Sequence, residues 1–296
     1  PITATGVITA NTLTITGTGG ASTTIVSLGS VLINAGGGNV TVTANNAAAG
    51  ANTGITQANT STITDNAVGS NISFISNNKI SQLGAITLVA NTGTAPANIV
   101  YDTTAGNNAT TITGGALTIG TGTSTAAINY LVKTNGAIIS VPAITVPGYI
   151  LLDNTCMGCA TAVTTSTAAA NGAAITITGA LSAGTLAGST GVTINAVANG
   201  TGVGFTQGAL AITSGAGGVT ITANSQTGIA YSSTGNITAT GQAITITTTT
   251  TTAAGISDTG TITGGVLSLV STQTTSTATA APITATGRSE ERRVGK

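Results

Sequence analysis

A short phrase of alternating apolar and Thr residues recurs along the whole chain and limits the folds that it can adopt. Bounded by Gly or Asn, the phrase occurs as LTITG at 13–17, VTVTAN at 40–45, ITITG at 175–179, VTITAN at 219–224 and ITIT at 244–247. Successive side chains of a β-strand point to opposite faces, so each copy predicts a strand with Ile, Val or Leu on one side and Thr on the other. The repetition predicts a stack of similar strand-turn units, not a globule around one central core.

The composition agrees with strands and argues against disorder. Hydrophobic residues make up 41% of the 296 positions and charged residues only 4%, whereas disordered chains combine low hydrophobicity with high net charge. The abundant Ile, Val and Thr are β-branched and suit a pleated, half-buried surface. Gly, with 42 copies, and Asn both tolerate positive φ, so we expect them at the corners between strands.

Two architectures use short strands at this spacing: an antiparallel sandwich or barrel, and a parallel β-solenoid. In a solenoid each strand pairs with its copy one coil above and below, so Thr, Asn and aliphatic residues stack in columns of their own kind. We expect aliphatic columns to fill a narrow interior that aromatic rings would overfill, and the chain has only four Tyr and two Phe. We therefore predict an all-β, right-handed parallel β-solenoid (β-helix) with about three strands and roughly 25 residues per coil.

The predicted solenoid is a single repeat region over 1–287, interpreted as an internal fragment because the chain starts at Pro1 without an export signal. Its period breaks near 135–170, where we expect an irregular excursion from the rod. Residues 288–296 (RSEERRVGK) hold half of the chain's twelve charges and resemble a translated sequencing adapter, so we interpret them as a non-native tail. The two remaining Lys cannot form a nucleic-acid-binding patch, and no run of 18 apolar residues predicts a membrane span.

The pair Cys156 and Cys159 is the one local motif whose side chains could form a disulfide, bind a metal ion or take part in a reaction. A zinc site would need further Cys or His ligands, and a thioredoxin-like redox site would need a helix start beside the thiol. We favour a local disulfide that closes the irregular loop, with unpaired thiols, metal binding and redox chemistry as the alternatives.

The other polar residues supply no recognisable catalytic set. Asp65, Asp102, Asp153 and Asp258 are scattered along the sequence, and we interpret them as solvated turn residues. With no His in the chain, Ser and Thr have no partner of the usual kind to activate them as nucleophiles. Stacked Thr-x-Thr pairs would form a hydroxyl–methyl lattice that resembles the ice-binding face of some antifreeze solenoids, although Thr is also simply a good outward strand residue.

The phrases ITITG, VTITAN and GAL(A/T)I, joined by Thr-, Gly- and Asn-rich turns, resemble the repetitive β-helical shafts of large bacterial surface proteins. Filamentous haemagglutinin-like exoproteins and autotransporter adhesins are the families in question. The Asn-Pro motifs of the haemagglutinin-type secretion domain do not occur in the chain. The resemblance covers about 1–287 and implies an extracellular or outer-surface rod.

From this resemblance we expect a non-catalytic stalk or adhesin segment without a cofactor. Its partners would be a host-cell or polysaccharide surface ligand, together with copies of itself end to end. The alternatives are a polysaccharide-acting β-helix enzyme, which needs Asp and Lys to converge in a cleft, and an ice-binding solenoid, which needs the Thr pairs on one flat face.

Overall fold

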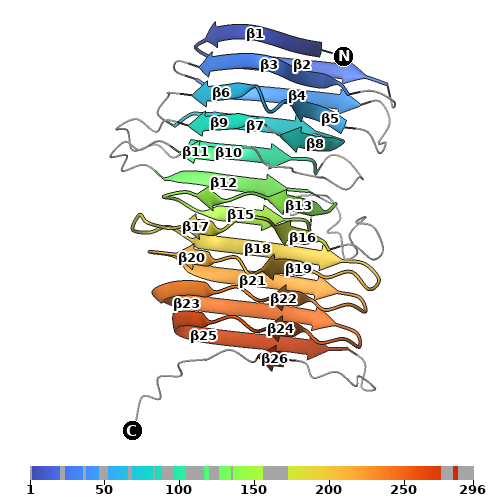
Figure 1. Ribbon diagram of the computed structural model, residues 1–296, viewed down its shortest axis with the longest axis vertical. Coiled ribbons are helices and arrows are strands. Elements are labelled where there is room, and N and C mark those ends of the chain that lie inside the picture. Colours follow the sequence, from blue (N-terminus) through green and yellow to red (C-terminus); the bar gives the residue numbers. More distant parts are fainter. Residues whose placement is uncertain are drawn as a thin grey trace.

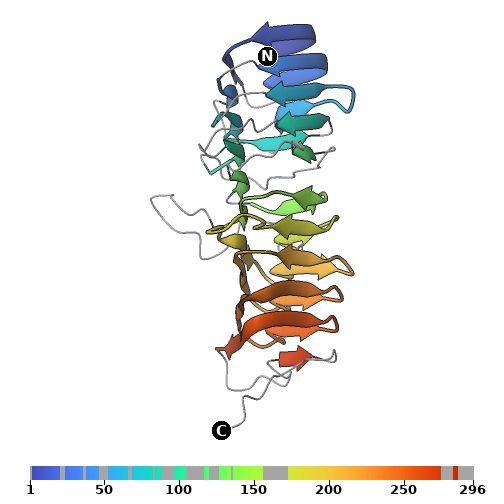
Figure 2. The ribbon, with the colours of Figure 1, turned by 90° about the vertical axis from the view of Figure 1, so that its left-hand side faces the viewer.

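The chain forms a parallel β-solenoid in which successive coils stack from the N-terminal to the C-terminal end (Figure 1). The computed structural model describes residues 2–20, 24–35, 38–46, 53–65, 69–82, 84–88, 97–104, 117–119, 127–134, 136–155, 173–274 and 283–285. Within these ranges every regular element is a strand, and none is a helix. The view in Figure 2, turned by 90°, shows how narrow the stack is compared with its height.

The longest run of paired strands, here called the long ladder, extends through almost the whole stack. In order from the N-terminal end it contains β2 (Leu13–Gly19), β4 (Val40–Asn46), β7 (Asn71–Ser76), β10 (Ala97–Asp102), β12 (Ile128–Lys133), β15 (Ile150–Asp153), β18 (Gly191–Ala198), β21 (Gly218–Ser225), β23 (Ile237–Thr250) and β25 (Ile262–Gln273). All of these pairings are parallel, which is the signature of a coil that returns to the same face one turn later.

The other faces of the coil are also parallel ladders. In the N-terminal half they are formed by β1 (Ile2–Ala10), β3 (Val26–Ala35), β5 (Thr53–Gln57), β6 (Thr62–Asp65), β8 (Lys79–Gln82), β9 (Ala85–Leu88) and β11 (Leu117–Ile119). One face of the C-terminal half contains β13 (Ile138–Val141), β16 (Ile175–Ile177), β19 (Phe205–Gly208), β22 (Tyr231–Ser233), β24 (Ile256–Asp258) and β26 (Ile283–Ala285). Its other face contains β14 (Ile144–Thr145), β17 (Leu181–Ala183), β20 (Ile212–Ser214) and the first residues of β23 and β25.

The predicted parallel β-solenoid with three strands per coil is therefore confirmed. In the C-terminal part, the equivalent residues Val192, Val219, Ile244 and Leu267 follow one another after 27, 25 and 23 residues. The interval rises to 42 residues between Ile150 and Val192. The segment 156–172, which lies outside the described residues, falls in that interval.

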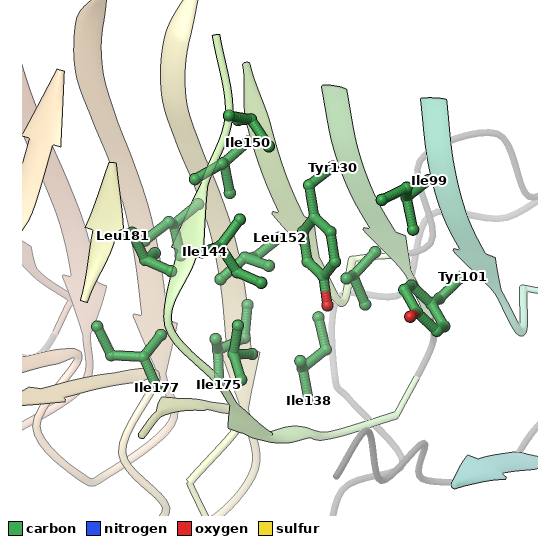
Figure 3. Packing of buried hydrophobic residues seen from close by; sticks show 14 of the residues in the cluster. Ile99, Tyr101, Tyr130, Ile138, Ile144, Ile150, Leu152, Ile175, Ile177 and Leu181 are labelled. Atoms are coloured by element: carbon green, nitrogen blue, oxygen red, sulfur yellow. The ribbon is translucent and has the colours of Figure 1, made fainter. Parts of the chain in front are cut away.

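Two columns of apolar side chains from the long ladder fill the interior. The first runs through Leu13, Val40, Ile72, Ile99, Tyr130, Ile150, Val192, Val219, Ile244 and Leu267, and the second through Ile15, Val42, Phe74, Tyr101, Val132, Leu152, Ile194, Ile221, Ile246 and Leu269. From Val40 to Ile246 every member is buried. Figure 3 shows part of this cluster, including Ile138, Ile175 and Leu181 from strands on the other faces of the coil.

Aromatic rings occupy this interior, so the expectation that they would overfill it is wrong. Phe74, Tyr101, Tyr130, Phe205 and Tyr231 are all essentially inaccessible to solvent. Phe74 and Tyr101 lie on neighbouring rungs with ring centroids 5.2 Å apart and planes within 10°, and Phe205 and Tyr231 stack similarly at 5.6 Å. Two stacked rings are separated by about the distance between neighbouring strands of the ladder. The interior therefore accepts aromatic residues when they lie on adjacent strands, here called rungs.

Glycine lets some strands bend from one face to the next. Residues 237–239 of β23 pair with β20, whereas residues 244–249 of the same strand pair with β21. Gly241, between the two parts, has φ of +73°, and Gly6 has φ of +92° at the corresponding irregularity of β1. Only glycine adopts such angles without steric cost, which agrees with the expectation of Gly at corners.

Removing the hydroxyl group should change the free energy of unfolding in opposite directions for two buried tyrosines. The Tyr130 hydroxyl is buried and has no hydrogen-bond partner among the described residues, whereas Tyr231 Oη donates to Gln207 Oε1 at 2.6 Å. We expect Tyr130→Phe to raise the free energy of unfolding by about 1 kcal/mol and Tyr231→Phe to lower it by about 1–2 kcal/mol, because the second change leaves a buried acceptor unpaired. Urea denaturation of the two variants measures both values, and a destabilised Tyr130→Phe would contradict the assignment.

Alkaline pH should destabilise the fold through the same residues. Burial raises the pKa of Tyr101, Tyr130 and Tyr231, with the neighbouring Tyr130 adding to the effect at Tyr101. Above about pH 10 the unfolded chain loses phenolic protons that the folded chain keeps, so the contribution of these tyrosines to stability should be constant between pH 8 and about pH 10 and fall above it. Urea midpoints between pH 8 and pH 12 check this expectation. Tyr101→Phe and Tyr231→Phe should each make the decline shallower, and unchanged slopes would refute the explanation.

Candidate functional site

The outward side chains of the long ladder form the most regular surface of the molecule. One column contains Thr14, Thr41, Ser73, Val100, Leu131, Leu151, Thr193, Thr220, Thr245 and Ser268, and the next contains Thr16, Thr43, Ile75, Asp102, Lys133, Asp153, Asn195, Thr222, Thr247 and Val270. Four of the five Thr-x-Thr pairs in the repeated phrases thus share one face, namely Thr14/Thr16, Thr41/Thr43, Thr220/Thr222 and Thr245/Thr247. The fifth, Thr176 and Thr178, belongs to β16 and the turn after it, on a different sheet.

The Thr columns are interrupted in the middle of the rod. On β10, β12 and β15 the first column carries Val100, Leu131 and Leu151, while the second carries Asp102, Lys133 and Asp153. Leu131 is only 8% exposed and Asp153 only 1%, so this stretch is more enclosed than the exposed Thr14, Thr16 and Thr220. The outer face is therefore two Thr-rich blocks separated by a mixed apolar and charged patch.

The charged column was not anticipated from the sequence. Asp102, Lys133 and Asp153 are 31 and 20 residues apart, yet they are in register on three successive rungs. Opposite charges at this spacing attract, so the order Asp, Lys, Asp avoids the stacked like charges that a regular repeat would create. Asp65 and Asp258 end β6 and β24 on other faces, so the four carboxylates do not converge on one site.

The aspartates are structural groups of the turns, and their interpretation as solvated residues is wrong for most of them. Asp65, Asp153 and Asp258 are at most 3% exposed, and Asp102 is half-buried. Asp102 Oδ1 accepts hydrogen bonds from Thr104 N and Oγ1, at 2.9 and 2.6 Å, and Asp153 Oδ1 accepts the same pair from Thr155, both at 2.7 Å. Asp258 Oδ1 likewise accepts from Gly260 N at 2.9 Å. Because each of these three carboxylates accepts a hydrogen bond from the amide two residues ahead, the turn folds back over it.

A ladder of asparagine side chains borders the Thr columns on the N-terminal half of the face. Asn98 Nδ2 donates to Asn71 Oδ1 at 2.7 Å, and Asn129 Nδ2 donates to Asn98 Oδ1 at 2.9 Å. The ladder is closed by backbone amides, since Asn71 N donates to Asn39 Oδ1 and Tyr149 N to Asn129 Oδ1. Stacked Asn residues therefore bond through their amides and add a side-chain ladder to the backbone one.

A shallow groove of about 260 Å³ lies at the other border, near the C-terminal end. It is lined by Val197, Ala198, Asn224, Ser225, Gln226, Thr249, Thr250, Thr251 and Thr274, so its surface carries amides and hydroxyls but no charged or aromatic group. Val197, Asn224 and Thr249 occupy equivalent positions on successive rungs. The side chains of Asn224 and Thr249 have no hydrogen-bond partner among the described residues, which leaves these groups available to a neutral polar ligand.

Some predicted features fall outside what can be placed. Cys156, Cys159 and the tail 288–296 lie outside the described residues, so the disulfide stays a prediction. The described part of the chain contains no group of three or more acidic, Cys or His residues arranged to hold a metal ion. It also contains no helix long and apolar enough to cross a membrane.

Breaking the asparagine ladder should destabilise the rod. A carboxylate at position 98 would face Asn71 Oδ1 and repel it, so we expect Asn98→Asp to lower the free energy of unfolding by about 1–3 kcal/mol at pH 7. Asn236→Asp is the matched control, because Asn236 is exposed and its side-chain oxygen accepts a bond from Thr261 N, which a carboxylate can also accept. Thermal or urea denaturation compares the two, and an equal effect of both changes would contradict a special role of the ladder.

No protein-family model matches the chain, and comparison with curated proteins and with solved structures likewise finds no match.

Proposed function

We propose that this chain is a non-catalytic stalk segment of a secreted or surface-displayed protein, whose polar flank contacts polysaccharide. The observation that carries the proposal is the long ladder, which runs in register from β2 to β25. Each rung is hydrogen-bonded to the next and shares the same buried columns, so the rod resists bending without a separate core.

The state of the carboxylates supports a role without catalysis. A general acid or base needs a carboxyl group within reach of a ligand, and Asp102, Asp153 and Asp258 instead accept hydrogen bonds from their own turns. Lys133 lies between two such aspartates, and the polar groove is lined by other strands. The polysaccharide-acting enzyme is therefore the weaker reading of this surface.

We assign ligand contact to the shallow groove near the C-terminal end, here called the polar groove. Its free amide and hydroxyl groups, on Asn224 and Thr249, repeat at the spacing of the rungs, and its lining carries no charge that would favour an ionic ligand. A neutral polysaccharide offers rows of hydroxyl groups that both donate and accept, which matches such a surface. The affinity of one groove is expected to be weak and to grow when many copies are displayed together.

The stalk role is tested by replacing the rod. The chain is fused between a bacterial surface anchor and a fluorescent domain, and the height of the fluorophore above the membrane is measured by super-resolution microscopy. We expect the height of the rod to be narrowly distributed around about 45 Å, because ten rungs stack about 4.8 Å apart, whereas a flexible Gly/Ser linker of equal residue number has an end-to-end distance of roughly 95 Å and a broad distribution of heights. The variant Val219→Asp, which buries a charge in the interior column, should lose the difference. A height distribution of the rod as broad as that of the linker would refute the stalk role.

Ligand contact is tested separately by affinity electrophoresis of the chain in gels containing neutral polysaccharides. We expect retardation that the double change Asn224→Ala and Thr249→Ala reduces at least fivefold. The matched control changes Thr14 and Thr16 to Ala, at the opposite end of the same ladder, and should migrate like the unchanged chain. Retardation that is unaffected by the groove variant would place binding elsewhere, and none at all would limit the proposal to the stalk.

A second candidate function, ice binding, is favoured by the shared register of the Thr pairs. Thr193, Thr220 with Thr222, and Thr245 with Thr247 form one block on β18, β21 and β23. A flat lattice of hydroxyl and methyl groups is the feature that this function needs, and the interruption by Asp102, Lys133 and Asp153 limits its size. Inhibition of ice recrystallisation that Thr222→Lys abolishes and Thr213→Lys preserves would support the candidate. Absence of inhibition in the unchanged chain would exclude it.

A further inference from the structure

The turn that follows β18 contains an Asn-Gly pair, Asn199 and Gly200. The sequence holds two further Asn-Gly pairs, at 135–136 and 171–172, whose asparagines lie outside the described residues. In such a pair the backbone nitrogen of Gly can attack the side-chain amide carbon of Asn, because glycine has no Cβ to obstruct the approach and little to restrict its backbone. The reaction in a folded chain therefore depends on how the peptide unit between the two residues is held.

The peptide unit between Asn199 and Gly200 is hydrogen-bonded on both sides. Its carbonyl oxygen, Asn199 O, accepts a bond from Gly202 N at 3.0 Å within the same turn. Its nitrogen, Gly200 N, donates to Gln226 Oε1 at 3.1 Å, and Gln226 follows β21 on the next coil. The side chain of Gln226 thus binds the nitrogen that would attack Asn199.

Other bonds between the same two turns do not involve the Gln226 side chain. Thr227 N donates to Gly200 O at 2.8 Å, and Ser225 Oγ donates to Gly202 O at 2.5 Å. Ser225 is buried, whereas Gln226 is exposed. A change of the Gln226 side chain therefore removes the bond to Gly200 N and leaves the contact between the two turns in place.

We propose that Asn199 is a modification site at which deamidation is restrained by the hydrogen bond from Gly200 N to Gln226. In this reaction Gly200 N forms a bond to Asn199 Cγ, the bond from Cγ to the side-chain nitrogen breaks, and the proton of Gly200 N ends on the ammonia that leaves. Water then opens the resulting succinimide ring at either carbonyl and gives aspartate or isoaspartate. Overall, water replaces ammonia, nothing is oxidised, and a neutral amide becomes a carboxylate.

The bond to Gln226 Oε1 opposes this reaction in two ways. An acceptor oxygen stabilises the protonated nitrogen, so the nitrogen loses its proton less readily and is the weaker nucleophile. Movement of the nitrogen toward Asn199 Cγ also requires that this bond be broken. Gln226 acts through Gly200 N and is not itself changed, so it is a positioning residue.

The product alters a border of the rod that is otherwise neutral. Ala198, which precedes Asn199, and Gln226 both line the polar groove, and no residue of that lining is charged. Deamidation would place a carboxylate beside this groove, and isoaspartate would also lengthen the backbone of a turn that the next coil contacts. The inference rests on the geometry of the turn and does not depend on the proposed function.

The test is the rate of deamidation at Asn199 in the folded chain at mildly alkaline pH. Gln226→Met removes the acceptor and keeps a side chain of similar length, so it should raise the rate roughly fivefold, the factor that corresponds to one hydrogen bond of ordinary net strength. Gln226→Glu keeps an acceptor oxygen and should keep the slow rate. Mass spectrometry of proteolytic peptides follows the replacement of the amide by a carboxyl group at each Asn-Gly pair, and circular dichroism verifies the strand content.

The matched control is Thr227→Ala, which alters an exposed side chain of the same turn and keeps the bond from Thr227 N to Gly200 O. It should deamidate at Asn199 like the unchanged chain, and the unchanged chain should react faster in urea than when folded. Equal rates at Asn199 in Gln226→Met and the unchanged chain would overturn the proposal. Equal acceleration at all three Asn-Gly pairs would overturn it too, because that result reflects loosening of the whole fold and not loss of one bond.

Discussion

The in-register contact between successive coils is the interaction on which the rest of this structure depends. It combines backbone hydrogen bonds along the ladder with side chains that meet residues of their own kind one rung away. Val192, Val219 and Ile244 illustrate the apolar version, while Asn71 and Asn98 illustrate the polar one. Because each coil contacts mainly its two neighbours, stability accumulates along the rod and does not converge on a centre.

The same contact explains where unusual residues are tolerated. An aromatic ring is accepted at Phe74 because Tyr101 lies on the next rung and stacks with it at 5.2 Å. A charged residue is accepted at Lys133 because Asp102 and Asp153 flank it in the column. In both cases a residue that breaks the repeat is matched by another on the neighbouring rung. The central part of the long ladder therefore departs from the Thr pattern without interrupting the backbone pairing.

The surface that results is almost uncharged, regular and rich in hydroxyl groups. Its carboxylates hold turns together, and its groove is lined by Asn224, Thr249 and similar neutral groups. A surface of this kind suits additive contacts with extended polymers better than the binding of one small molecule, because it repeats along an axis and encloses little volume. This is the physical basis for proposing a stalk with a polysaccharide-contacting flank.

The sequence by itself determined the type of element, the buried side of each strand and the coiled arrangement, because alternation of Ile or Val with Thr is a local property of phrases such as VTITAN. It also indicated that Asn residues would stack and that Gly would serve the corners. Only the tertiary structure decided which distant residues became neighbours, including the alignment of Asp102, Lys133 and Asp153. The reason is that intervals between equivalent residues range from 20 to 42, and no local signal records how long each turn is. The burial of the aspartates was decided at the same level, since a turn residue becomes buried only when its own loop folds back over it.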